Sequence, residues 1–308
     1  MPSAGTPAKD GRAAGLLLAV ASSLAFGMSG SLARGLFDTG WSPGAVVLIR
    51  ISIGALVLLP IGLGSLAGRW YLLRRNLGLV LAYGLLAVAS AQYCYFAAVQ
   101  RMDVGPALLI EFTAPAAVVA WMWIRHDQRP TRVTVAGAVV AAAGLVLVLD
   151  LLSGVSVDVA GIAWAFAAMV GCTVYFVVNG DDTVDLPPFA LASSGLVVGG
   201  LGLAVLAAVG ILPIATATAH VDLGGADVSW WVPLVLLGVV TAGVPYVLGI
   251  AAGRRLGSRL VSFVSLLEVV AGVAFAWLLL DQVPSATQVA GGALILAGVV
   301  GVRLGERA

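Results

Sequence analysis

Three ionisable side chains stand inside long apolar stretches of this sequence. Arg50 lies within 44–64, Glu111 within 104–124 and Glu268 within 257–280. At the centre of a bilayer a charged group costs about 2.5–3.5 kcal/mol on insertion scales, and such groups commonly mark a substrate or proton pathway. At a helical rise of 1.5 Å per residue, both glutamates come roughly 12–13 Å into their stretches, near the midplane.

Each of these charges has more than one interpretation. Glu111 or Glu268 binds a substrate ammonium group or carries a coupling proton, or else is a structural carboxylate held by helix ends, hydroxyls and an arginine. Arg50 holds a substrate carboxylate, pairs with Glu111, or extends to the membrane interface.

Polar and aromatic side chains and two prolines accompany the charges. A tyrosine hydroxyl deep in an apolar helix needs a partner, which a cavity supplies. Proline can kink a membrane helix and free a backbone carbonyl at a gate, although membrane helices also simply tolerate it. The predicted lining residues are Gln92, Tyr93, Tyr95, Trp164, Tyr175 and Tyr246, and the predicted gating residues are Pro115 and Pro245.

A different chemistry is suggested by Asp181, Asp182 and Asp185, which read DDxxD. Carboxylates at this spacing can hold Mg²⁺ against a diphosphate in a membrane-embedded enzyme. The motif stands alone, and the sequence contains no second acidic motif, phosphate-binding loop or nucleophile elbow. A solvated acidic loop is therefore the favoured interpretation, and we expect no enzyme activity, cofactor or metal.

The composition is that of a membrane protein. Of 308 residues, 61% are hydrophobic and 10% are charged, and the mean hydropathy is +1.07. No basic block indicates nucleic acid, and nine further spans favour a retained first helix over a cleaved signal peptide. We expect an all-α membrane protein with ten transmembrane helices near 13–33, 44–64, 77–99, 104–124, 132–152, 159–179, 189–211, 231–251, 257–280 and 286–303.

The basic residues predict the orientation, because cytoplasmic loops carry excess Lys and Arg. With the N-terminus in the cytoplasm, 13 of the 16 basic residues fall inside, 2 (Arg34 and Arg101) fall outside, and Arg50 is embedded. The opposite orientation inverts this ratio. We therefore expect a multi-pass protein of a bacterial-type inner membrane with both termini cytoplasmic.

The two halves of the chain repeat each other at a shift of 154 residues. The shift superposes Ala97-Ala98 on Ala251-Ala252, Arg101 on Arg255, Trp123 on Trp277, Asp127-Gln128 on Asp281-Gln282, Gly137 on Gly291 and Gly144 on Gly298. Five spans per half is an odd number, so residues 1–152 and 153–308 are predicted to be inverted repeats. Such repeats suit alternating access around a midplane site.

Spans five and ten are rich in small residues, including Gly137, Gly144, Gly291 and Gly298. Small residues let helix backbones approach closely. The sequence leaves open whether they pack within the monomer or across a homodimer.

Several motifs resemble the drug/metabolite transporter superfamily, specifically its ten-helix EamA-type members. In the first half the resemblance rests on Ser42-Pro43 through Arg50, on the run 105–115, and on the loop with Asp127 before the glycines of span five. In the second half it rests on Pro245-Tyr246 followed by Arg255 and Leu267-Glu268, and on the loop with Asp281 before the glycines of span ten. The run 105–115 is similar to threonine/homoserine-exporter-like members. The chain departs from the family in having Asp127 and Asp281 for Glu, Val269 for Pro, and Phe26-Gly27 in the first span.

The resemblance implies export of amino acids or related small metabolites from the cytoplasm without ATP. Three functions follow: a secondary carrier for small amino acids, with or without proton coupling, a multidrug or lipophilic-metabolite exporter of the same fold, and the Mg²⁺-dependent enzyme. Loss of transport in Glu268→Gln favours the first, and dependence on aromatic residues alone favours the second.

Overall fold

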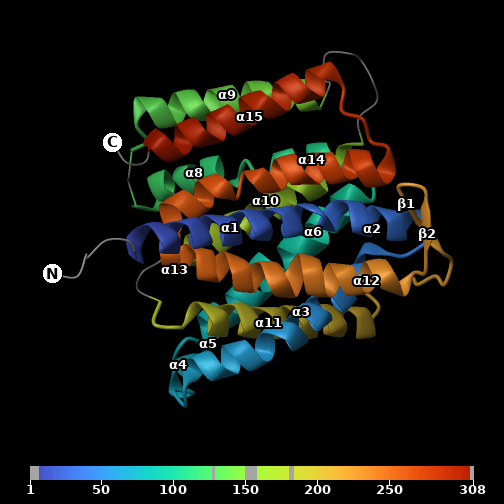
Figure 1. Ribbon diagram of the computed structural model, residues 1–308, viewed down its shortest axis with the longest axis horizontal. Coiled ribbons are helices and arrows are strands. Elements are labelled where there is room, and N and C mark those ends of the chain that lie inside the picture. Colours follow the sequence, from blue (N-terminus) through green and yellow to red (C-terminus); the bar gives the residue numbers. More distant parts are fainter. Residues whose placement is uncertain (1–6, 127–128, 150–157, 180–183, 306–308) are drawn as a thin grey trace.

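The computed structural model describes residues 7–126, 129–149, 158–179 and 184–305. Within these ranges the chain is helical almost throughout, with one short hairpin (Figure 1). In chain order the elements are α1 (Pro7–Gly27), α2 (Ser29–Asp38), α3 (Pro43–Leu66), α4 (Tyr71–Arg75), α5 (Leu77–Ala82), the π-helical segment η1 (Tyr83–Ser90), α6 (Ala91–Val99), α7 (Val104–Glu111), α8 (Ala114–His126), α9 (Arg132–Val148), α10 (Val159–Asn179), α11 (Pro188–Ala208), β1 (Val221–Leu223), β2 (Ala226–Val228), α12 (Trp231–Gly238), the π-helical segment η2 (Val239–Gly243), α13 (Val244–Val264), α14 (Leu267–Leu280) and α15 (Ala286–Gly305).

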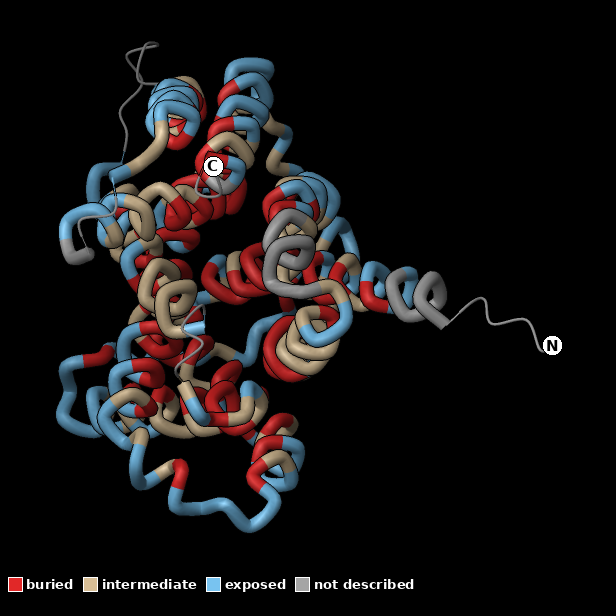
Figure 2. The backbone as a smooth tube through the Cα atoms, turned by 90° about the vertical axis from the view of Figure 1, so that its left-hand side faces the viewer, coloured by how far each residue is buried: buried red, intermediate tan, exposed pale blue. Residues whose placement is uncertain are grey.

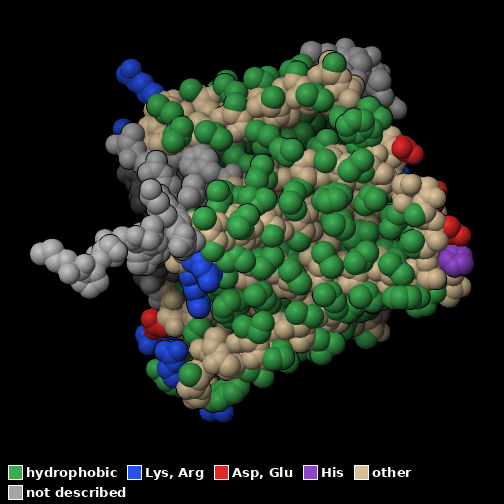
Figure 3. All heavy atoms as spheres, viewed as in Figure 1, with side chains coloured by type: hydrophobic (Ala, Val, Ile, Leu, Met, Phe, Trp, Pro, Cys, Tyr) green, Lys and Arg blue, Asp and Glu red, His purple; other side chains and the backbone are tan. Residues whose placement is uncertain are grey.

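The helices run side by side across the longest dimension of the molecule. In the described part of the chain, seven helical stretches are long and apolar enough to cross a membrane, and three shorter apolar helices accompany them. Hydrophobic side chains cover the face seen in Figure 3, with most of the visible Lys and Arg toward one edge and most of the visible Asp, Glu and His toward the other. We call the end where α1 begins and α15 ends the terminal end, and the end that carries β1 and β2 the hairpin end (Figure 1).

The structure corrects two details of the predicted fold. The loop expected at 252–256, between the eighth and ninth predicted spans, is helical, since α13 continues through it to Val264. Within this stretch Arg255 Nη1 donates to the Ala251 carbonyl at 3.0 Å. The all-α description is incomplete, since β1 and β2 form an antiparallel hairpin. Its two-residue turn needs positive φ at both positions, which Gly224 (φ +63°) and Gly225 (φ +80°) supply.

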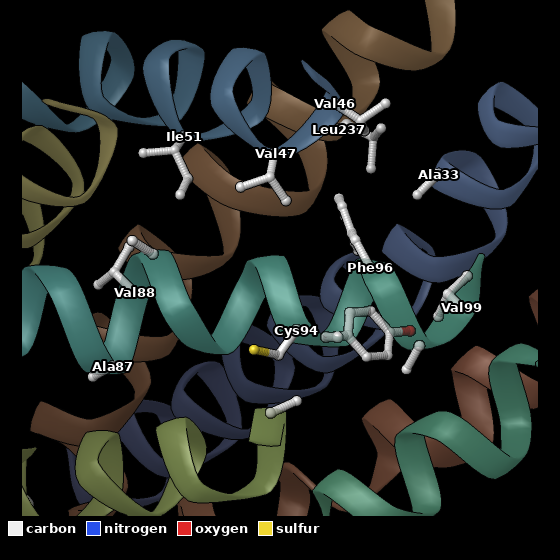
Figure 4. Close-up of a cluster of buried hydrophobic side chains, with 14 of the residues drawn as sticks. Ala33, Val46, Val47, Ile51, Ala87, Val88, Cys94, Phe96, Val99 and Leu237 are labelled. Carbon is white, nitrogen blue, oxygen red and sulfur yellow. The ribbon is translucent and has the colours of Figure 1, made fainter. Parts of the chain in front are cut away.

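The core lies where α6 is surrounded by other helices. Phe96 is 0% exposed and extends from α6 toward Val46 of α3 and Leu237 of α12, with Ala33 of α2 nearby (Figure 4). Viewed at right angles, many helices appear end-on, with buried turns inside and exposed turns outside (Figure 2). An apolar helix such as α6 requires this surrounding.

Helices α9 and α15 pack antiparallel through glycine. A Cβ atom built at Gly137 would lie 2.6 Å from the Gly298 carbonyl oxygen, and one at Gly144 would lie 2.5 Å from that of Gly291. The contacts are reciprocal, because a Cβ at Gly291 would meet the Gly144 carbonyl oxygen at 2.6 Å. A shift of 154 residues therefore converts one contact into the other. Within the described residues, these small side chains serve packing inside the chain.

Enlarging this interface should destabilise the protein. We expect Gly144→Val to cost about 1–3 kcal/mol, since the added methyl groups meet the α15 backbone, which cannot move aside like a side chain. Gly64→Val is the matched control, because the described residues place nothing within 4 Å of a Cβ at Gly64. Thermal unfolding of the detergent-solubilised variants measures the difference. Equal melting temperatures for the two variants would contradict the close packing.

Candidate functional site

The helix that carries Glu111 is broken just after this residue. α7 ends at Glu111, and α8 begins at Ala114. Pro115 is the second residue of α8 and has no N–H, so the Glu111 carbonyl four residues earlier receives no helical hydrogen bond from it. Pro115 therefore lies at a break rather than at a kink of a continuous helix.

A second break precedes Glu268. α13 ends at Val264, and α14 begins at Leu267. Glu268 lies in the first turn of α14, and its N–H donates to the Ser265 carbonyl at 3.0 Å. The partial positive charge of a helix N-terminus favours a carboxylate there. The two breaks, at 112–113 and 265–266, agree with the 154-residue repeat to within one residue.

Arg50 donates to a backbone carbonyl that a second proline, Pro245, leaves without its helical donor. Pro245 cannot donate to the carbonyl of Thr241, four residues earlier and within η2. Arg50 Nη2 donates to that carbonyl at 2.8 Å, and Nη1 donates to Gln92 Oε1 at 2.8 Å. The guanidinium also lies 5.2 Å from the ring centroid of Phe96. Arg50 thus joins α3 to α6 and to η2.

Arg50 does not extend to the interface, because it is only 4% exposed. Among the described residues no ion pair joins Arg50 to Glu111. The structure therefore contains neither an interfacial arginine nor an Arg50–Glu111 ion pair. Its Nε has no hydrogen-bond partner among the described residues. The guanidinium therefore keeps a buried donor beside the cavity it lines.

Arg50, Glu111 and Glu268 line one cavity of about 680 Å³. The cavity reaches the surface at the terminal end, where its lining residues Asn179 and Arg254 are exposed. Lining residues farther along α6 and α7, such as Tyr95 and Leu108, are buried. The cavity therefore opens toward the terminal end.

Most of the predicted site residues border this cavity. Besides the three charged side chains, these are Gln92, Pro115, Tyr175, Pro245 and Tyr246. Tyr93 and Trp164 do not border it and instead contact each other edge to face, with ring centroids 5.6 Å apart.

Of the two α6 tyrosines predicted to line the pathway, Tyr95 borders the cavity and Tyr93 does not. The sequence prediction omitted several other lining residues, among them Ala87 and Ala91. Ser22, Ser23, Phe26, Ser29, Cys172 and Asn179 also line the cavity and carried no charge that would have marked them.

The structure describes one of the three aspartates of the DDxxD motif. Asp181 and Asp182 lie outside the described residues, and Asp185 forms a surface ion pair with Arg75 at 3.1 Å. The described residues contain no group of three or more His, Cys, Asp or Glu side chains that could hold a metal ion.

A bundle of membrane-length helices around a cavity with charges on helix breaks is the architecture of a small-molecule membrane transporter. The profile of the EamA-like transporter family matches residues 13–150 and again residues 159–304. The chain belongs to the EamA-like transporter family, and it is a multi-pass membrane protein. The family resemblance predicted from the sequence is confirmed.

Similar proteins include two threonine/homoserine exporters. The chain is 28% identical over 270 residues to the threonine/homoserine exporter RhtA of Salmonella typhimurium strain SL1344, covering 84% of this chain and 82% of the exporter. It is 28% identical over 253 residues to RhtA of Escherichia coli K12, covering 80% and 77%. A solved crystal structure with 20% sequence identity superposes with a TM-score of 0.65 over 96% of this chain and 98% of that one, which supports the fold.

The Arg50–Thr241 bond should depend on Pro245. We expect Arg50→Met to destabilise the protein by about 1–3 kcal/mol, because it leaves a buried carbonyl unpaired. Pro245→Ala restores an N–H that can bond this carbonyl within the helix, so Arg50→Met should cost less in that background. A double-mutant cycle by thermal unfolding measures the coupling, with exposed Arg74→Met as the control. If the unfolding free energies of the two substitutions are strictly additive, the Arg50 hydrogen bond does not compensate for the N–H that Pro245 lacks.

Proposed function

We propose that the chain is a secondary transporter that exports small amino acids or related zwitterionic metabolites across a bacterial-type inner membrane. The observation that carries this proposal is the placement of one buried guanidinium and two carboxylates, Arg50, Glu111 and Glu268, around one cavity. A zwitterion presents both complementary charges, a carboxylate for Arg50 and an ammonium group for the glutamates. The names of the similar RhtA exporters support amino-acid cargo.

The proposed membrane arrangement has ten crossing helices in two inverted repeats, 1–152 and 153–308. The seven long and three shorter apolar helices overlap the ten predicted spans. The reciprocal glycine contacts of α9 and α15 support the inversion. The π-helical segments support the repeat itself, since a shift of 154 residues carries η1 (83–90) onto 237–244, which contains η2 (239–243).

In this arrangement the terminal end faces the cytoplasm, as the distribution of Lys and Arg predicts. Cargo then reaches the cavity from the cytoplasm, and alternating access carries it to the other side. Glu111 and Glu268 stand at helix breaks, where the two halves of a span can change their angle without losing a continuous hydrogen-bond ladder. A carboxylate that releases an ammonium group can take up a proton, which gives a route to proton coupling.

The second candidate is an exporter of lipophilic molecules. Its support is the aromatic part of the lining, which includes Phe26, Phe112 and Tyr246. Phe26 and Tyr246 contact each other edge to face at 5.5 Å. Transport that survives Glu268→Gln but fails in Tyr246→Ala and Phe112→Ala would favour this candidate over amino-acid export.

Efflux from proteoliposomes tests the main proposal. Liposomes preloaded with a radiolabelled amino-acid panel that includes threonine and homoserine should release one or more members. Glu111→Gln and Glu268→Gln should each slow release by about tenfold or more, since a charged hydrogen bond contributes about 1.5–3 kcal/mol. Glu306→Gln is the matched control at the third glutamate of the chain. No release of any amino acid or small amphiphile would contradict the proposal.

Labelling of single cysteines tests the orientation. In a background without Cys94 and Cys172, a membrane-impermeant maleimide should label Asp227→Cys in intact spheroplasts. It should label Arg74→Cys only after permeabilisation. Both positions are exposed, Asp227 at the hairpin end and Arg74 in α4. The reverse pattern would place the terminal end outside.

A further inference from the structure

A second cavity, of about 270 Å³, lies on the side of α7 and α14 away from the main cavity. Its walls come from Leu109 of α7, Val269 and Val273 of α14, and Gly292 and Leu296 of α15. We call it the α14–α15 crevice. Its lining includes side chains exposed at the surface, among them Val270 at 52% and Val289 at 57%.

The crevice exists because the α9–α15 pair joins the bundle loosely. α15 packs along α9, and beyond this it touches mainly α7 and α8. In Figure 1 the pair is set apart from α14. Gly292 leaves room on this side, since the nearest atom to a Cβ built there is Leu109 Cδ1 at 3.4 Å. If an apolar crevice of this size were empty, the atoms along its lining would lose van der Waals contacts.

The lining changes from polar to apolar along the crevice. The polar members, Asp103, Gln282 and Gln288, lie at the hairpin end. Gln282 Oε1 accepts a hydrogen bond from the Val104 N–H at 3.2 Å, which fixes this mouth. From Gln288 to Leu296 the crevice follows eight residues of α15, about 12 Å at the helical rise, close to one leaflet of a hydrocarbon core about 30 Å thick.

We propose that the α14–α15 crevice binds one acyl chain of a phospholipid from the leaflet at the hairpin end. The depth matches a leaflet, and the polar mouth matches the headgroup region. Among the described residues no basic side chain lines the crevice, whereas the carboxylate of Asp103 does. The charge therefore favours a headgroup with an ammonium group, such as phosphatidylethanolamine, over an anionic one.

The position links this lipid to the main site. Leu109 lies two residues before Glu111, and Val269 follows Glu268 directly, so the same helix ends border both cavities. The acyl chain packs behind the two breaks and fills space that protein side chains leave open. This inference concerns the scaffold and does not depend on which molecule is transported.

Native mass spectrometry of the whole protein in mild detergent tests the proposal. After addition of dioleoyl-phosphatidylethanolamine, the wild type should retain one lipid per chain at detergent concentrations that remove the rest, and dioleoyl-phosphatidylglycerol should be retained less. Ala293→Phe places a ring in the crevice and should lose the retained lipid. Ala163→Phe, the same change at an exposed position of α10, should keep it.

Cross-linking of the wild type provides a measurement that does not rely on the folding of a variant. An equimolar phosphatidylethanolamine with a diazirine in its acyl chain should label peptides from Leu267–Leu280 and Ala286–Gly305. Excess unlabelled phosphatidylethanolamine should remove this labelling. The proposal would be overturned by labelling spread evenly over the exposed helices, or by lipid retention that Ala293→Phe leaves unchanged. It would also be overturned by a dimer that Ala293→Phe converts to monomers, because that result would identify a second copy of the chain as the occupant.

Discussion

The interaction on which the rest of the site depends is the bond from Arg50 to the carbonyl that Pro245 leaves without a donor. A buried arginine at membrane depth is costly, and so is an unpaired carbonyl. Each removes part of the other's cost, because the guanidinium donates to Thr241 at 2.8 Å while a second nitrogen donates to Gln92. The two bonds and the ring of Phe96 fix the guanidinium, so its remaining donor has a defined position beside the cavity.

This interaction has no counterpart in the other half of the chain. A shift of 154 residues carries Arg50 to Ala204, Glu111 to Ser265, and Glu268 back to Ala114. The features that do correspond are structural: the glycine contacts of α9 and α15, the two π-helical segments and the two helix breaks. The repeated scaffold therefore surrounds a site without symmetry. A site of this kind can distinguish the two ends of a small molecule, which a pair of equivalent charges could not.

The sequence predicted the apolar spans, the buried charges and the family, because hydropathy and rare ionisable residues are visible in a single chain. From Pro115 it predicted a bend in span four, but it did not predict helix ends at 112–113 and 265–266, since Thr113 and Ser265 are single hydroxyl residues within apolar stretches. It also did not separate Tyr95, which borders the cavity, from Tyr93, which does not. Both follow η1, where an i to i+5 pattern shifts the helical phase, and only tertiary contacts decide which face of α6 meets the cavity. The sequence did predict that Pro245 frees a backbone carbonyl. It did not predict the donor, Arg50, which lies 191 residues from Thr241 in the chain.

The helix breaks also place the two carboxylates where the spans can bend. Glu111 ends one half-helix and Glu268 begins another, so a ligand that contacts both carboxylates touches the two places where the spans can bend. At the hairpin end, α14 is tied by the Gly224 N–H, which donates to the Leu279 carbonyl at 2.9 Å. Val221 of the same hairpin is buried against Gly35 of α2. Opening the cavity toward the hairpin end therefore requires α14 to move with the hairpin or to part from it. Arg50 holds α3, α6 and η2 together through its hydrogen bonds. Under the proposed function, the half-helices that carry the glutamates are therefore the elements that would move when cargo binds.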